Sequence, residues 1–434
     1  MCVQRKIFIS LAALFMGPGF LISQNKRLIS GNIIDAVTKE PLPFVTVSLK
    51  KQLIGVVTNE EGKFDLYVPP EVKNDTLFVN YLGYKHFLMD ITEIKEPITI
   101  KLLETVVQLE EIVVRPLSPE NYIQMAMRKI KQNYPKDPFQ TEAYYREKVH
   151  ENKNLVKCDE GVFKTYYLNF IDTLKPQHQL LLFRRAADPQ AVAFMSESRR
   201  KFELKDSKTI KDTTAVKDSS AVKDSTNKGK KLTIDLSDSF GGPSEILKSS
   251  GISYKPKAFL DSLQFKHFKY SFAKSSTYNT NELMVIDFES RGKVNHVREK
   301  GKIYIDLSSL AVVKIECSGN FIIPAIIKPI LFVVNIRIKN PTFATKSEFQ
   351  LVDGKWYPKS IENNVDLKMI NWHWFRKNDR STFEIEQYFF VNDLKTIAIA
   401  EVPPEKRFDS KKEMEKQVYN DNGLTWEGLN IIKK

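Results

Sequence analysis

One spacing in the sequence is that of a metal site. His296-Val297-Arg298-Glu299 places a histidine three residues before a glutamate. Zinc peptidases use this pair with a later histidine, here His373, and leave the fourth position open for water. Six histidines among 53 acidic residues produce such a spacing easily by chance, and the surrounding residues read as strands rather than as an α/β enzyme. A zinc carboxypeptidase is therefore a distant alternative, and we expect no bound metal.

Other catalytic motifs are absent from the sequence. There is no Gly-x-Ser-x-Gly elbow, no Gly-Lys-Ser/Thr phosphate loop and no His-Glu-x-x-His pair. Paired carboxylates such as Glu110 and Glu111 are too common to indicate acid–base chemistry. The sequence thus predicts no catalytic residue and no cofactor.

An almost uniformly apolar stretch runs from Phe321 to Ile336. Pro324, Lys328 and Pro329 make it a poor membrane-spanning helix. We favour a strand-loop-strand of the core over a lid that closes an apolar cavity.

A second aromatic stretch contains Trp372, Trp374 and Phe375, flanked by basic residues. This is the amphipathic character of an interfacial anchor. In a strand, Trp372 and Trp374 share one face while Phe375 lies on the other, which suits ordinary two-sided burial, and we favour burial. Together the two stretches supply the candidate contacts for an apolar ligand or a membrane: Phe321, Ile326, Ile330, Phe332, Trp372 and Trp374.

The elements that must position these residues are mainly strands. A length of 434 residues predicts about three domains, and 28 Phe, 16 Tyr and 4 Trp favour β-rich packing. Short strands are expected over residues 28–35, 44–49, 53–58, 63–68, 76–80, 85–91 and 98–103. Seven short strands in so few residues predict a sandwich that folds by itself.

Four ordered motifs in this first part carry a resemblance to a known family. They are Gly31-x-Ile-Ile-Asp35-x-x-Thr-x-Glu-Pro-Leu-Pro-Phe-Val45, Gly55-x-x-Thr-Asn-Glu-Glu-Gly-Lys-Phe64, Tyr81-Leu-Gly-Tyr84 and Leu109-Glu-Glu-Ile-Val-Val114. The segment resembles a carboxypeptidase regulatory-like domain, and its last motif is similar to the one that ends this domain in many Gram-negative envelope proteins, including TonB-dependent receptors. The resemblance implies a transthyretin-like sandwich over residues 25–116 without catalytic residues of its own.

The rest of the chain predicts a second, larger β domain. Residues 117–204 begin with a short helical connector, opened by Ser118 and Pro119, and continue with strands that contribute to this domain. Residues 205–239 contain a Lys-Asp-Ser/Thr repeat and read as a low-complexity loop or linker. Residues 240–402 predict a large antiparallel sheet, and residues 403–434 a charged C-terminal helix and tail. Two stretches, residues 301–306 and 353–358, resemble strand pairs in the curved half-barrels of bacterial lipoprotein carriers.

The N-terminus has the pattern of a targeting signal. Arg5 and Lys6 precede an apolar run that ends near Ile22, as in a secretory signal peptide, which we place at residues 1–23. Export to the periplasm or the outer membrane periphery makes nucleic acid an improbable partner. Cys158 and Cys317 are then either a disulfide or two buried free thiols, and we favour the thiols.

These observations predict a mainly β, non-catalytic, exported envelope protein that acts by binding or assembly. A net charge of +13 suits an anionic surface, and the expected partners are an envelope protein, a lipid surface or a glycan surface. The alternative is a carrier or chaperone for lipid or lipoprotein, in which the large sheet encloses an acyl chain. The sequence does not predict the oligomeric state.

Overall fold

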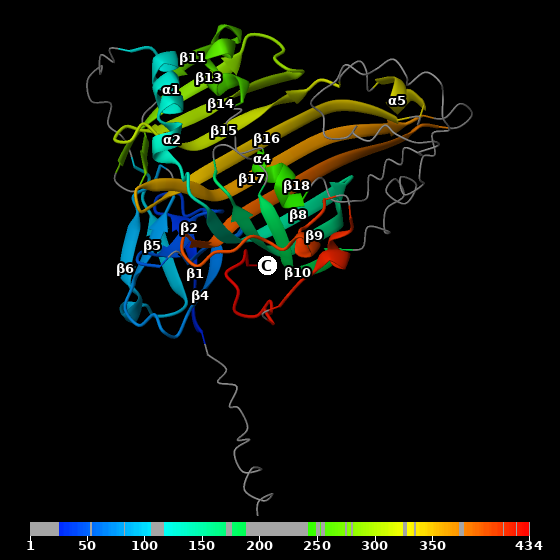
Figure 1. Ribbon diagram of the computed structural model, residues 1–434. Helices are drawn as coiled ribbons and strands as arrows, with labels where there is room; N and C mark the ends of the chain where they lie inside the picture. Colours follow the sequence, from blue (N-terminus) through cyan, green and yellow to red (C-terminus); the bar gives the residue numbers. More distant parts are fainter. Residues whose placement is uncertain are drawn as a thin grey trace, which may run out of the picture.

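A computed structural model of the chain describes residues 26–433, except 53, 82, 106–116, 171–175, 188–241, 249–251, 253–256, 274–275, 279–280, 324–327, 334–335, 373–376, 411 and 422. The expected signal peptide and the low-complexity segment 205–239 lie outside the described residues. The fold is mainly β, as predicted: a small two-sheet sandwich lies beside one large open sheet (Figure 1).

The sandwich has the seven strands that the sequence predicts. One sheet has the order β4-β1-β7, formed by β4 (Lys63–Val68), β1 (Arg27–Asp35) and β7 (Ile98–Leu102). The other has the order β3-β2-β5-β6, formed by β3 (Gly55–Val57), β2 (Thr46–Leu49), β5 (Thr76–Asn80) and β6 (Phe87–Asp90). Their apolar residues form a separate core, which includes Ile29, Ile33, Val47, Phe64, Leu77 and Val79.

The motif residues of the sandwich make its turns. Gly62 has a φ of 72°, and a Cβ there would lie 2.5 Å from the Ile33 carbonyl oxygen, so only glycine fits. The Asp35 carboxylate accepts hydrogen bonds from the backbone of Thr38 and from the Tyr84 hydroxyl. The backbone N–H of Thr38 is the main cause that lowers the pKa of Asp35.

The large sheet is antiparallel and does not close. Its order is β10-β9-β8-β18-β17-β16-β15-β14-β13-β11, and β12 also pairs with β13. The strands are β8 (Phe139–Glu151), β9 (Asn154–Tyr167), β10 (Gln177–Ala187), β11 (Phe268–Phe272), β12 (Ser276–Tyr278), β13 (Asn281–Ser290), β14 (Val297–Asp306), β15 (Val312–Phe321), β16 (Ile336–Val352), β17 (Lys355–Asn371) and β18 (Asp379–Lys395). Strands from both sides of residues 205–239 thus join one sheet.

Helices cover one face of this sheet. They are α1 (Pro119–Arg128), α2 (Ile130–Asn133) and α4 (Gly242–Lys248), seen in front of the strands in Figure 1. The α1 helix begins as predicted, because the Ser118 side chain accepts the Asn121 backbone N–H and Pro119 occupies the first turn. Ile123 of α1 and Ile246 of α4 belong to the main core with the strand residues of this face, which we call the helix-covered face.

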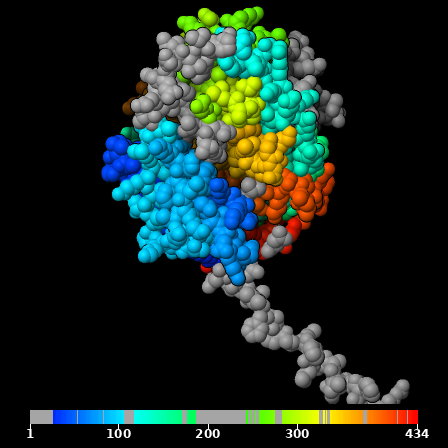
Figure 2. Space-filling model, turned by 90° about the vertical axis from the view of Figure 1, so that its left-hand side faces the viewer, coloured from blue at the N-terminus to red at the C-terminus, as the bar shows by residue number. Residues whose placement is uncertain are grey.

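The sandwich and the C-terminal segment pack against the opposite face, which we call the sandwich-side face. Phe44 and Val57 of the sandwich form one apolar cluster with Tyr144, Tyr388 and Phe390 of the sheet. Figure 2 shows the blue sandwich lying directly against the orange part of the sheet.

Beyond the last strand, the chain ties the two domains together. The Asn430 side chain accepts the Tyr67 backbone N–H and donates to the Tyr67 carbonyl, so it pairs with the edge strand β4. Lys433 adds an ion pair with Asp65 at 2.7 Å. The sandwich and the sheet are thus joined by direct contact and through this segment.

Two element predictions are wrong. In place of the charged helix expected within residues 403–434, the described residues form two 3-10 turns, η6 (Pro404–Lys406) and η7 (Met414–Gln417). Near η7 the Gln417 amide donates to the carbonyls of Asp409, Lys412 and Glu413 and competes with helical bonding. The strand-loop-strand expected at residues 321–336 contains instead a short helix, α5 (Lys328–Val333). Among the described residues, no helix has the length and apolar character needed to cross a bilayer.

Candidate functional site

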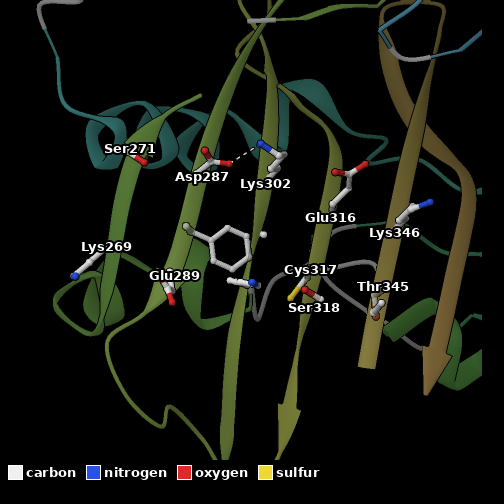
Figure 3. Close-up of a pocket in the computed structure, with 14 residues that line it drawn as sticks. Lys269, Ser271, Asp287, Glu289, Lys302, Glu316, Cys317, Ser318, Thr345 and Lys346 are labelled. Atoms are coloured by element: carbon white, nitrogen blue, oxygen red, sulfur yellow. Dashed lines mark hydrogen bonds and ion pairs between the residues drawn. The ribbon is translucent and has the colours of Figure 1, made fainter. Parts of the chain in front are cut away.

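An open groove lies on the sandwich-side face of the large sheet. Its volume is about 600 Å³, and its floor is formed by β11, β13, β14, β15 and β16. Figure 3 shows the polar side chains that line it: Lys269, Ser271, Asp287, Glu289, Lys302, Glu316, Ser318 and Lys346. We call this region the charged groove.

The charges of this groove alternate in sign across the strands. In one row, Asp287 lies opposite Lys302, then Lys302 opposite Glu316, and Glu316 opposite Lys346. Lys302 and Asp287 form an ion pair at 2.8 Å. In the next row, Glu289 lies between Lys269 and Lys300. Each charge therefore has an opposite charge beside it, which stabilises cross-strand pairs.

The same compensation continues toward the sandwich. Lys314 lies 3.0 Å from Glu316 and 3.2 Å from Glu348. Burial alone would lower the pKa of Lys314, but the carboxylates of Glu348 and Glu316 raise it well above its usual range. Burial alone would raise the pKa of Glu348, but Lys314 and Lys359 lower it to about 2. At this end of the face, the buried lysines and carboxylates thus neutralise one another.

A row of buried polar side chains crosses the helix-covered face. On β8 and β9, Lys157 lies 2.8 Å from Glu147 and 3.4 Å from Asp159, and Arg185 of β10 pairs with Asp159 at 2.8 Å. Lys157 is only 2% exposed. Both carboxylates thus have a cation partner, as a buried ionic group requires.

This polar row continues across the strands on the other side of β8. Gln387 of β18 donates to both Tyr145 and Glu147, Asn363 of β17 donates to Gln387, and Thr345 of β16 donates to Asn363. Glu147 and Gln387 separate the main core from a smaller apolar cluster that includes Val149, Phe383 and Met369. Sequence reasoning missed the row, although single polar residues interrupt the apolar positions of β8 and β18.

Beyond the polar row, three long strands extend to one end of the sheet. β16, β17 and β18 each have 17 residues, whereas strands usually have three to ten. Their ends with the residues beside them (residues 336–339, 366–372 and 377–384), the β8–β9 turn (residues 151–154) and α5 form what we call the distal tip, at the right of Figure 1.

The distal tip contains three of the six apolar residues that the sequence marked as candidate contacts, Ile330, Phe332 and Trp372. Phe332 of α5 is 62% exposed, and its ring centroid lies 5.2 Å from that of the half-buried Trp372. Phe321 is 41% exposed and packs on Phe343 at 4.7 Å. Ile330 lies in α5, whereas Ile326 and Trp374 are outside the described residues. The core burial expected for residues 321–336 is therefore wrong for Phe321, which ends β15, and for Phe332, which lies on α5 at the end of the long strands.

The metal-like motif is divided between solvent and core. His296 is exposed in a turn with a φ of 65°, whereas Glu299 is buried and accepts a hydrogen bond from the Cys317 thiol at 3.4 Å. Burial raises the pKa of both groups. His373 lies outside the described residues, and within the described ranges no three His, Cys, Asp or Glu side chains form a group that could hold a metal ion. Cys158 and Cys317 are both buried free thiols.

With this geometry established, comparison with known proteins accounts for the first domain. The sequence matches the CarboxypepD_reg-like domain family over residues 29–114. Residues 29–114 form a CarboxypepD_reg-like domain. This domain is a non-catalytic module, and its match confirms the resemblance drawn from the sequence motifs. No curated protein matches the chain.

Solved structures show only distant likenesses. A DUF1329 family protein from Desulfovibrio piger has 7% identity and a TM-score of 0.21, and the match covers 65% of this chain and 93% of that one. A putative membrane-associated protein of unknown function from Bacteroides fragilis has 10% identity and a TM-score of 0.15, with 85% and 98% covered. Lipovitellin, solved for its lipid–protein interactions, has 8% identity and a TM-score of 0.23, with 62% and 26% covered. None of these likenesses supports a functional statement about this chain.

Proposed function

We propose that this protein is a non-catalytic, exported protein of the cell envelope, that it acts by binding, and that the distal tip is its binding surface. The observation that carries the proposal is a pair of like charges. Lys339 of β16 lies directly opposite Lys368 of β17, and like charges in this position destabilise a sheet. An anionic partner would remove the repulsion.

The two other regions considered above are less suited to binding. In the charged groove each cation already has a carboxylate beside it, and the polar row is buried. A ligand would have to break existing ion pairs at either place. At the distal tip, by contrast, the basic side chains are available.

The proposal of a non-catalytic role is supported by the regulatory-like domain and by the absence of catalytic motifs from the sequence. The proposal of an envelope location is supported by the basic residues and apolar run at the N-terminus.

Cell fractionation tests the proposal in the organism that makes the protein. We expect immunoblots to find a processed chain in the envelope fraction, and high salt to release it because ionic attraction is screened. The double variant Lys339→Gln, Lys368→Gln should move to the soluble periplasmic fraction. Lys269→Gln, Lys300→Gln is the matched control on the same sheet face and should behave as the natural protein. An unprocessed cytoplasmic chain, or equal retention of both variants, would contradict the proposal.

The carrier alternative needs an apolar cavity. Outside the distal tip, the helix-covered face of the sheet is instead occupied by fully buried side chains, among them Tyr145, Phe163 and Phe389. Lipid extraction and mass spectrometry of the protein purified from its own envelope distinguish the two functions. A stoichiometric acyl chain that survives purification would favour the carrier, and we expect none.

A further inference from the structure

The distal tip combines an exposed aromatic residue, Phe332, with basic residues that form no ion pair within the described part of the chain. We propose that this tip docks on the surface of a lipid bilayer that contains anionic headgroups. The inference rests on the proposed function, in which the tip is the binding surface, and it names the partner.

The charge of the tip is strongly basic. Its exposed basic residues are Lys153, Lys328, Arg337, Lys339, Lys368, Lys377 and Arg380. None of these seven takes part in an ion pair among the described residues. Basic side chains beside a membrane are attracted to its anionic headgroups, and their contributions add.

The acidic side chains of the tip do not balance this charge. Asp366, Asp379 and Glu384 are the partly or fully exposed ones, and the Asp366 carboxylate accepts from the Thr342 hydroxyl. Glu151 is buried, and its carboxylate accepts a hydrogen bond from the Ser381 hydroxyl. Basic residues therefore exceed acidic ones at this end of the sheet.

The aromatic pair favours a lipid surface over a purely ionic partner. Phe332 is largely exposed and contacts Trp372, which directly follows Asn371, the last residue of β17. Aromatic rings at such a position are suited to the headgroup level of a bilayer, where one side of the ring is apolar and the other is hydrated. A glycan or an acidic protein would attract the same lysines, and the vesicle experiments below separate these partners from a bilayer.

Position in the fold supports the same orientation. β16, β17 and β18 project beyond the main core, and α5 packs beside β16 at their ends. Leu331 of α5 packs on the small apolar cluster, while the neighbouring Phe332 is 62% exposed. The tip can therefore meet a flat surface with the ends of its strands.

Vesicle sedimentation with the full chain tests this inference. We expect binding to vesicles that contain phosphatidylglycerol and little binding to vesicles of phosphatidylcholine alone, with affinity falling as salt rises. Lys339→Gln, Lys368→Gln should weaken binding about tenfold while relieving the like-charge pair, so loss of folding would not explain the result. Lys269→Gln, Lys300→Gln should leave binding unchanged.

The aromatic part is tested with a second matched pair. Phe332→Ser should reduce vesicle binding severalfold, whereas Leu263→Ser, at a residue 78% exposed elsewhere on the surface, should have no effect. Equal binding to both kinds of vesicle, or equal losses in the tip and control variants, would overturn the inference. If envelope retention depends on Lys339 and Lys368 but no vesicle is bound, the partner is a glycan or a protein. In that case this inference is wrong while the proposed function stands.

Discussion

The part of the large sheet outside the distal tip, which we call the near part, pairs its charged side chains and buries its large apolar ones, whereas the distal tip leaves both kinds exposed. In the charged groove, Lys302 lies between Asp287 and Glu316, whereas at the tip Lys339 faces Lys368. In the near part Phe389 is fully buried, whereas at the tip Phe332 is largely exposed. The difference shows that one sheet can satisfy its own side chains over most of its area and leave one end to be satisfied by a partner.

Large truncations should separate the two parts most clearly. We expect Phe389→Ala to lower the free energy of unfolding by about 3 to 5 kcal/mol, because it removes a buried ring and leaves a cavity. Phe332→Ala should cost less than about 1 kcal/mol, because the ring is mostly in water. Chemical denaturation measures both. Similar losses for the two variants would remove the distinction between core and tip.

Removal of the cation at the centre of the polar row should cost slightly less. Lys157→Met removes the cation that lies 2.8 Å from Glu147 and 3.4 Å from Asp159, and loss of one partner of a buried ion pair destabilises a fold by about 3 kcal/mol. The expected result is a lower midpoint in chemical denaturation. Lys153→Met, at an exposed residue of the adjacent turn, should be nearly neutral. An unchanged midpoint for Lys157→Met would mean that the ion pairs of the buried polar row do not stabilise the sheet.

The buried imidazole of His178 should make the near part sensitive to acid. Burial lowers the pKa of His178 from 6.5 to about 3, so the unfolded chain takes up a proton as pH falls below 6.5 while the folded chain does not until about pH 3. Stability is therefore lost across this window, by about 2 kcal/mol between pH 6.5 and pH 5. His178→Asn should remove this pH dependence, and His267→Asn, at an exposed histidine, should keep it. Chemical denaturation at several pH values measures this dependence. If stability varies with pH in the same way in the two variants, His178 is not the cause of the loss.

The smallest effects should have opposite signs in the two regions. Lys339→Glu creates an opposite-charge pair with Lys368 and should stabilise the protein by about 0.5 kcal/mol. Lys302→Glu puts a carboxylate between Asp287 and Glu316 and should destabilise it by about 0.5 to 1 kcal/mol. Thermal denaturation at low salt measures both changes, which should shrink as salt is added. If both variants change stability in the same direction, the alternation of charge in the groove does not contribute to stability.

The outcome for individual residues shows where sequence reasoning succeeded. Gly62 and Asn59 define a local turn whose geometry depends on adjacent residues, so the turn was predictable. Phe332 was assigned to the core because its neighbours are apolar, but it lies beyond the reach of the covering helices. Apolar sequence indicates what would gain from burial, and not whether another element is present to bury it.

The sequence by itself determined the mainly β class, the seven strands of the regulatory-like domain and the start of α1, because strand alternation, turn glycines and helix caps act over a few neighbouring residues. Only the tertiary structure decided that Lys339 faces Lys368, that Lys157 lies between two carboxylates, and that Cys158 and Cys317 remain apart as free thiols. Each of these depends on strand order and register among residues far apart in the chain. A shift of one residue in register exchanges the two faces of a strand, and no local pattern sets the register of 17-residue strands.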